Sequence, residues 1–475
     1  MIKWQSLCGI IVLFLLSGCT VGPDYLRPEV PLPENWRLVP QQAQRFSNLS
    51  WWDQYGDPQL SQLITEALDS NLDLAVAAAR IEELMGLYGS SRSAQRPKVD
   101  GIADWTRSAA DGLTADLWQL KLSSSWEIDL WGRLRRNSEA AWADMMASEA
   151  GRSSLVLSLV ASVATAYIDL LNLDRQLEIA HRTTKSRQDA LDVFTLRLDA
   201  GLVTPMEVAQ IRSEYHDAMA VIPQLEQDIA IREHGLCVLL GRNPGPIRRG
   251  RVLADLSMPQ VPVALPAQIL NQRPDIRQAE ESLIAANARI GVARAAYFPT
   301  ISLTGVLGSV SGELSSLLNG SGEVWSLGVP LSLPIFSGGQ LKAGVETAEA
   351  RQKQALLKYR QTILKALQEV EDGLVRQQQI AKLLISFGEK VAALQEYAEM
   401  SRLRYEEGYV GYLEILDAQR SLFASELLYT ERRAIELQSA VALYKATGGG
   451  WNQEVSQSSE TAETAVDETG HLKKD

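Results

Sequence analysis

Cys19 has the sequence setting that points most directly to chemistry. One lysine, Lys3, precedes an apolar run over residues 9–16, and Leu16-Ser17-Gly18-Cys19 follows at its end. This pattern is typical of a secretory signal, residues 1–18, that ends in a lipobox, where the cysteine thiol becomes lipidated. The run is shorter than the about 20 apolar residues of a membrane-spanning helix. We expect lipid on Cys19, and Thr20, in place of the aspartate that retains lipoproteins in the inner membrane, predicts the outer membrane of a Gram-negative cell.

Other residue types that carry chemistry are scattered. None of the four histidines has Cys, Asp or Glu at metal-ligand spacing: His181, His216, His234 and His471. Cys237 lies among apolar residues and is expected to be a small buried side chain. The glycines at 448–450 follow a predicted helix, which indicates a helix end and not a phosphate loop. We therefore predict no enzyme, no catalytic or metal site, and no cofactor beyond the lipid. A net charge of −12 argues against nucleic-acid binding.

The chain contains the same pattern twice. G-x-x-R-x-A-x-x-P begins at Gly89 and again at Gly291, an offset of 202 (291 − 89). Further along, Gly201 matches Gly408 at an offset of 207. Self-similarity over this distance predicts an internal tandem duplication, with five more residues in the second copy (207 − 202).

Alternating apolar and polar residues follow each repeated proline. The alternation is clearest over Trp118–Asp129 and Trp325–Ile335, with further strands at Val99–Trp105 and from Ile301. Such strands fit a soluble antiparallel sheet or a membrane barrel that is apolar toward lipid, and the lipobox favours the barrel. Four strands cannot close a barrel of about eight or more, so several chains must close it together. The expected lipid-facing residues are Trp118, Leu120, Trp126, Leu327, Leu331 and Leu333, with Lys121 and Glu127 facing the lumen.

Two proline-free stretches, residues 134–200 and 341–407, predict helices of about 67 residues, roughly 100 Å long. In the second stretch, apolar residues recur at heptad-like spacing, which favours coiled-coil packing. Gly201 and Gly408 end these helices, and a second helix returns after each turn. Residues 153–168 are uncharged but too few to span a bilayer, so we expect a helix packing face there.

These features divide the chain into six parts. After the signal peptide 1–18 come the lipid anchor and extended segment 19–50 and the first repeat 51–240, with a β-hairpin at 98–130 and a helix pair at 132–240. A linker, 241–272, leads to the second repeat 273–447, with a hairpin at 300–336 and a helix pair at 338–447. The final segment, 448–475, ends in a Ser-, Thr- and Glu-rich tail that is expected to be disordered.

Several long stretches resemble a known family. LSGC, WWDQYGDPQLSQLI, EIDLWGRLRRNSEAA, RPDIRQAEESLIAANARIGVARAAYFPTISLTG and YLEILDAQRSLF are similar to the TolC-like outer-membrane factors of tripartite efflux systems, in particular the NodT-type lipoprotein branch. The resemblance implies a homotrimer whose twelve strands form one outer-membrane β-barrel, continuous with a long periplasmic α-helical coiled-coil barrel. It also implies an equatorial belt around the helices, made by residues 21–50, 241–271 and the region after Gly448.

The resemblance further implies an exit duct that passes small molecules outward from an inner-membrane RND transporter and a periplasmic adaptor. A type I protein-secretion duct and a structural coiled-coil envelope lipoprotein remain the alternatives. A duct should close at its periplasmic end, where Gly201 and Gly408 mark the helix turns. The resemblance places the gate at Leu413, Glu414, Asp417 and Arg420, with Glu207 in the first copy. Helical spacing puts Leu413, Asp417 and Arg420 on one face, and the alternative is an ordinary surface ion pair between Asp417 and Arg420.

Overall fold

The computed structural model describes residues 20–33, 35–38, 50–261, 266–319 and 322–449 of the 475-residue chain. The chain forms two compact units, each built from both halves of the sequence. Unit 1 comprises Met1–Pro31, Ala77–Gly151 and Asp275–Thr362. Unit 2 comprises Leu32–Val76, Arg152–Pro274 and Ile363–Asp475. Cys19 and His471 lie outside the described residues, as does the tail from residue 450.

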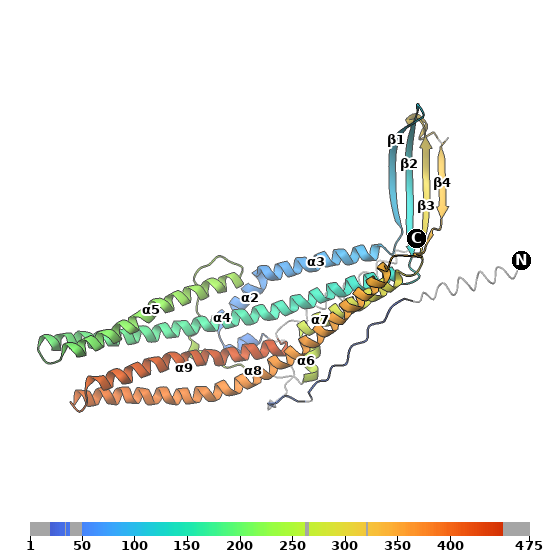
Figure 1. Cartoon of the computed structure of the whole chain (residues 1–475). Coiled ribbons are helices and arrows are strands. Elements are labelled where there is room, and N and C mark those ends of the chain that lie inside the picture. Colours follow the sequence, from blue (N-terminus) through green and yellow to red (C-terminus); the bar gives the residue numbers. More distant parts are fainter. Residues whose placement is uncertain (1–19, 34, 39–49, 262–265, 320–321, 450–475) are drawn as a thin grey trace, which may run out of the picture. The chain divides into compact units, whose positions relative to one another are not determined.

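Unit 1 contains one antiparallel sheet, whose long strands lie side by side in Figure 1. Its strands are β1 (Lys98–Ala110), β2 (Leu113–Ile128), β3 (Thr300–Ser311), β4 (Glu323–Gly328) and the short β5 (Leu331–Ser332). The spatial order is β1-β2-β3-β4, and β5 also pairs with β3. Asp111 and Gly112, both at positive φ, make the tight turn between β1 and β2. A hairpin from each half of the chain thus joins the other at the β2–β3 pairing.

The sheet differs from the sequence prediction in two places. β1 and β2 extend further toward their shared turn than the predicted Val99–Trp105 and Trp118–Asp129. The strand predicted over Trp325–Ile335 is wrong as a continuous element, since β4 ends at Gly328 and only Leu331–Ser332 pairs again. Pro330 and Pro334 have no backbone N–H to donate to a ladder, although the carbonyl of Pro330 still accepts from the Ser302 amide at 3.1 Å.

The N-terminal segment from Thr20 to Arg27 is fastened to the helices of unit 1. The guanidinium of Arg27 lies 2.9 Å from the carboxylate of Glu280, and the Tyr25 hydroxyl donates to the same carboxylate at 3.1 Å. Asp24 forms an ion pair with the buried Arg136. At Gly22 the two backbones come so close that an added Cβ would lie 2.5 Å from the Cα of Gly291. Glycine is therefore needed both at position 22 of this segment and at position 291 of the helix beneath it.

The helices have the lengths that the sequence predicts. α4 (Arg133–Asp199) and α8 (Gln340–Glu406) each contain 67 residues, and each is followed by a shorter partner, α5 (Pro205–Leu239) or α9 (Tyr412–Thr447). The starts of α4 and α8 differ by 207 (340 − 133), which is the offset of the repeated glycines. The remaining α-helices are α2 (Pro58–Ser70), α3 (Leu72–Ser93), α6 (Pro266–Gln272) and α7 (Pro274–Ala295).

The core of unit 2 packs parts from both halves of the chain together. Trp51, in the 3₁₀ helix η1 (Trp51–Tyr55), stacks on Tyr444 of α9 at 4.7 Å between ring centroids. The buried Tyr55 donates its hydroxyl to the carbonyl of Leu437 at 2.8 Å. Asp57 caps α2 through the Gln59 amide and also accepts from the Tyr167 hydroxyl of α4 at 2.8 Å. The linker that includes the 3₁₀ helix η2 (Leu253–Asp255) also packs into this core through Leu253 and Leu256.

One helix among the described residues, α4, is long and apolar enough to cross a membrane by length and composition. The apolar window of this helix is 61% buried within the structure itself. Val160, Val163 and Tyr167 from this stretch lie in the core of unit 2. Core packing therefore accounts for the apolar run, as the sequence analysis expects.

Candidate transmembrane sheet and helical tip

Cross-strand register brings the apolar residues of all the strands onto one face of the sheet. Trp118 lies opposite Trp105, and their rings stack at 5.5 Å. Leu122 lies opposite Leu307, which in turn lies opposite Trp325. Because residues directly opposite each other point to the same side, one face carries the apolar residues Val99, Trp105, Trp118, Leu120, Leu122, Trp126, Leu303, Leu307, Trp325, Leu327 and Leu331.

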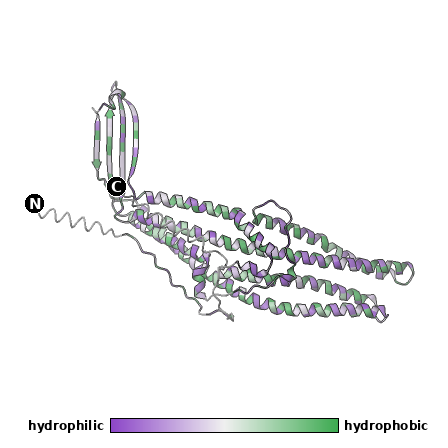
Figure 2. Cartoon of the chain, turned by 180° about the vertical axis from the view of Figure 1, so that it is seen from behind, coloured by the Kyte–Doolittle hydropathy of each residue, from purple (hydrophilic) through white to green (hydrophobic). Residues whose placement is uncertain are grey.

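This apolar face is exposed in the single chain. Trp325 and Leu327 are each 78% exposed, and Leu307 and Leu331 are more than half exposed. Figure 2 shows hydrophobic and hydrophilic residues alternating along the strands. A soluble sheet would bury its apolar face on a core, so this surface fits contact with another apolar phase or partner.

The opposite face carries most of the polar and charged residues of the sheet. Glu127 receives two hydrogen bonds from the Nη2 of Arg133, at 2.7 and 2.9 Å, and Lys121 bonds to Gln119. Lys98 and Asp100 form an exposed ion pair at 3.1 Å. The division is not complete, because Ile102, Leu113 and Leu117 also lie on this side.

One ion pair on the apolar face was missed by the sequence analysis. Arg107 of β1 and Asp116 of β2 lie directly opposite each other and pair at 2.7 Å. The Arg107 guanidinium also lies 5.8 Å from the ring of Trp105. The pair sits near the β1–β2 turn, beyond the Trp105–Trp118 stack. The predicted alternation began at Trp118, so it did not include Asp116.

The two outer strands leave the sheet open. Among the described residues, β1 pairs only with β2 and β4 pairs only with β3. Each outer strand therefore has one row of backbone N–H and C=O groups without a strand partner in the part of the chain that the structure describes. In a hydrocarbon environment such groups must be paired, which is why membrane sheets close into barrels.

At the tip of unit 2, glycines turn the long helices over. Gly201 after α4 has φ +71°, and Gly408 after α8 has φ +82°, a left-handed backbone that glycine adopts without a Cβ clash. Beyond the first turn, Thr204 and Glu207 form a capping box at the start of α5. The equivalent N-cap of α9 is Gly411, which has no side chain to cap the helix.

The predicted gate residues all lie near these turns but have separate partners. Asp417 and Arg420 pair with each other at 2.9 Å and are both exposed. Glu414 pairs with Arg404 of α8 at 3.1 Å, whereas Glu207 accepts from the Thr204 amide at 2.7 Å. These hydrogen bonds from the backbone and hydroxyl of Thr204 lower the pKa of Glu207 below its ordinary value. Leu413 is 66% exposed.

An aromatic cluster at the tip was also missed by the sequence analysis. Phe194 of α4 lies 4.2 Å from Tyr412 and 6.2 Å from Tyr405, measured between ring centroids. Arg197 donates to the Tyr405 hydroxyl at 2.8 Å. Burial and the nearby Tyr405 raise the pKa of Tyr412 to about 12. Phe194 has no counterpart at the repeat offset, so no spacing in the sequence pointed to this cluster.

The described residues contain no group of three or more His, Cys, Asp or Glu side chains that could hold a metal ion. Cys237 is buried and unpaired by disulfide, and its sulfur lies 3.3 Å from the carbonyl oxygen of Gly245. The thiol therefore packs inside unit 2.

The sequence matches one protein family along most of its length. A family model described as outer membrane efflux protein matches residues 63–242 and 265–449. The chain is 34% identical over 457 residues to the cation efflux system protein CusC of Escherichia coli O6:H1, covering 94% of this chain and 99% of that protein. It is also 34% identical to the solvent efflux pump outer membrane protein SrpC of Pseudomonas putida, covering 95% and 99%.

Solved structures agree with the sequence matches. The outer-membrane channel OprN superposes with a TM-score of 0.84 at 31% identity, covering 91% of this chain and all of that chain. The open state of the Neisseria gonorrhoeae MtrE outer membrane channel gives a TM-score of 0.84 at 31% identity, covering 92% and 99%. The described fold is therefore that of outer-membrane channel proteins.

Proposed function

The chain belongs to the outer membrane efflux protein family, and we propose that it is the exit duct of a tripartite pump that passes small molecules to the cell exterior. One observation carries this proposal most directly. The sheet exposes an apolar face and has two open edges, so it needs both lipid and neighbouring strands. A spacer lipoprotein made of coiled coils would need neither.

In this proposal three copies of the chain close one barrel. The four main strands of each copy, β1 to β4, would give twelve, with β1 of one copy pairing with β4 of the next. Twelve strands lie within the range of outer-membrane barrels, whereas four cannot enclose a lumen. The long helices α4 and α8, each about 100 Å by their rise per residue, would continue the duct into the periplasm.

The partners follow from the same assignment. A duct in the outer membrane receives cargo from a periplasmic adaptor and an inner-membrane transporter, here of the RND type. Relatives with the same 34% identity are named for different cargoes, cations for CusC and solvents for SrpC. This supports selection of cargo by the transporter and not by the walls of the duct.

The proposed lipid would be attached to Cys19, one residue before the first described residue, Thr20. Thr20 packs against Gly132, where an added Cβ would lie 2.9 Å from the Cγ2 of Thr20. Gly132 joins the end of β2 to the start of α4. A lipid attached one residue before Thr20 would thus enter the bilayer at the helix-side end of the sheet.

The proposed gate lies at the tip of the helices. In a trimer, Leu413 and Asp417 from three copies would form an apolar ring and an acidic ring around the duct axis. Like charges at close range repel, and Arg420, 2.9 Å from Asp417, would offset that repulsion at rest.

Single-channel recording in planar bilayers tests the proposed function. The purified protein should form discrete pores, because an open sheet edge has no other way to satisfy its backbone groups in lipid. A matched sample of the protein unfolded before reconstitution should give none. Absence of pores from folded, trimeric samples of both the wild type and the gate variant Arg420→Ala would favour the structural lipoprotein instead.

A further inference from the structure

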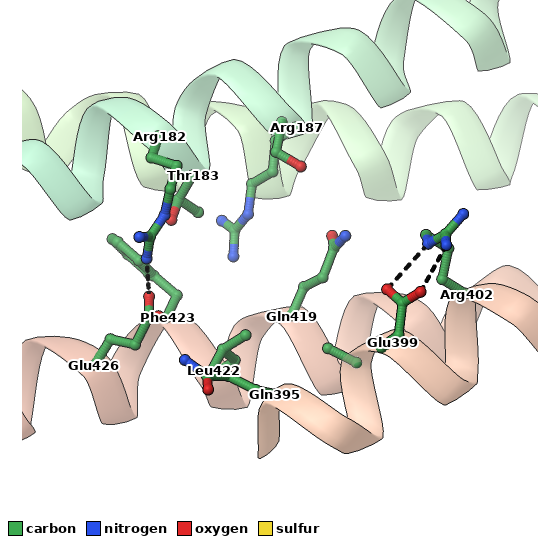
Figure 3. Close-up of a pocket in the computed structure, with 12 residues that line it drawn as sticks. Arg182, Thr183, Arg187, Gln395, Glu399, Arg402, Gln419, Leu422, Phe423 and Glu426 are labelled. Carbon is green, nitrogen blue, oxygen red and sulfur yellow. Dashed lines mark hydrogen bonds and ion pairs between the residues drawn. The ribbon is translucent and has the colours of Figure 1, made fainter. Parts of the chain in front are cut away.

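A cleft of about 330 Å³ lies within unit 2, between α4 of the first repeat and α8 and α9 of the second (Figure 3). Its lining includes three arginines, Arg182, Arg187 and Arg402, and two glutamates, Glu399 and Glu426. The whole chain carries a net charge of −12, so a cleft whose lining has more cations than anions departs from the general charge of the molecule.

Arg187 is the most buried of these charges, with 4% of its side chain exposed. It extends from α4 toward α9, and its guanidinium carbon lies 5.5 Å from the ring of Phe423 (Figure 3). Its carboxylate partner, Glu214 of α5 at 3.2 Å, does not line the cleft. Burial lowers the pKa of Arg187, and attraction to Glu214 and Asp217 only partly offsets that effect. A poorly solvated cation therefore borders an accessible space, and an anion there would improve its environment.

Arg182 and Arg402, called the rim arginines here because their side chains are about half exposed, already pair with glutamates of the lining. Arg182 lies 2.6 Å from Glu426, and Arg402 lies 2.7 Å from Glu399. The side chains of Arg182 and Arg402 are about half exposed, and surface pairs of this kind contribute little to stability. Arg402 also bonds Glu406 of α8 at 2.5 Å. Each guanidinium has five N–H donors, so both arginines can bond a further acceptor without leaving these partners.

We propose that this cleft is a binding site for a small oxyanion, a phosphate or a carboxylate group, held between Arg187 and the rim arginines. Planar guanidinium groups match both anions through paired N–H···O bonds. Arg182 and Arg187 come from the first repeat and Arg402 from the second, so the bound anion fastens the two helix pairs to each other. This role rests on the proposed function: the bound anion would resist the separation of helices that opening the duct requires.

Thermal unfolding of the purified trimer in detergent tests the site, with inorganic phosphate and citrate as probes and sodium chloride at matched ionic strength as the reference. Either probe should raise the unfolding temperature with a saturable dependence on its concentration, because it binds the folded state. Arg402→Gln, an exposed change, should weaken the apparent affinity by about tenfold or more, the effect of losing one charge-assisted bond. Arg187→Gln should abolish the saturable shift.

Lys185→Gln is the matched control, since Lys185 is an exposed cation on α4 that pairs with Asp189 and does not line the cleft. It should leave the saturable shift unchanged. The proposal is overturned if wild type shows no saturable shift, or if Arg402→Gln and Lys185→Gln respond alike. If Arg187→Gln does not fold, Arg402→Gln alone decides. The unfolding experiment does not depend on conductance. Failure to bind the anions would therefore refute the proposed site and leave the proposed exit duct untouched. A sample that binds the anions but forms no pores would refute the exit duct and leave the site.

Discussion

Glu207 and Glu414 lie 207 residues apart at equivalent helix starts, yet they bond to different partners. Glu207 accepts from the Thr204 amide at 2.7 Å and closes a capping box on its own helix. Glu414 follows Gly411, which offers no side chain, and pairs at 3.1 Å with Arg404 of α8. The carboxylate of Glu207 therefore acts within one helix, whereas that of Glu414 joins two helices.

Thr204→Ala should loosen the start of α5. The hydroxyl of Thr204 accepts from the Glu207 amide, and loss of such a cap costs about 1 kcal/mol. Hydrogen exchange of the first turn of α5 should then quicken by roughly fivefold, the equivalent of that free energy. Thr195→Ala on α4 removes a hydroxyl that only bonds back to the Leu191 carbonyl, and it should change exchange little. Equal effects of the two changes would contradict the capping role.

The same turn should respond to acid through Glu207. Its pKa is lowered in the folded chain by hydrogen bonds from Thr204, so the ionised form favours the folded turn. That contribution is complete above the pKa of the unfolded chain, ordinarily about 4.3, and disappears as pH falls through the lower folded value. Amide exchange at α5, corrected for the intrinsic rate, should therefore lose protection below about pH 4.3. Glu207→Gln should remove this pH dependence, and an unchanged profile in that variant would assign the effect to another group.

The sheet register predicts which residues meet lipid. Leu120→Arg should destabilise the assembled barrel by about 2–4 kcal/mol if it lies near the bilayer midplane, while Ser123→Arg on the other face should cost far less. Unfolding of the trimer in detergent measures the difference. In cysteine labelling, Lys121→Cys should react with a water-soluble reagent and Leu120→Cys should not, over the background of the buried Cys237. Labelling at 120 alone would shift the register by one residue.

Lipidation of Cys19 is tested by intact mass. The mature chain should begin at Cys19 and carry added acyl mass, and Cys237→Ser should retain it. Cys19→Ser should impair processing more than the channel, because the proposed barrel would already hold the chain in the bilayer and the lipid adds about 0.8 kcal/mol for each buried methylene. An unmodified wild-type Cys19 would refute this expectation.

How far the sequence predicts the structure depends on which interactions decide each element. The bounds of α4 and α8 were predicted to within one residue, because Gly201 and Gly408 follow the last turns in the left-handed backbone that ends a helix. The β4 strand was predicted too long, because the alternation of side chains carries no information about backbone hydrogen bonds, and Pro330 has no N–H to donate. The Glu414–Arg404 pair and the Phe194–Tyr412 contact join separate helices, and neither follows from spacing along one helix.

The final prediction concerns the proposed gate. The exposed Asp417–Arg420 pair would contribute about a few tenths of a kcal/mol in a single chain, so substitutions should barely affect stability. In a trimer the same residues would surround the duct axis, and their effect on conduction should be large.

Leu413→Ala and Arg420→Ala should each raise resting conductance in planar bilayers, the first by widening the apolar ring and the second by releasing Asp417. Asp417→Ala should weaken block by divalent cations, since three carboxylates at the axis of the proposed trimer would form their binding site. Arg175→Ala provides the control, because Arg175 forms a similar exposed pair with Glu178 on α4 at 2.5 Å. Unchanged conductance and divalent block in all three gate variants would place the constriction elsewhere along the helices.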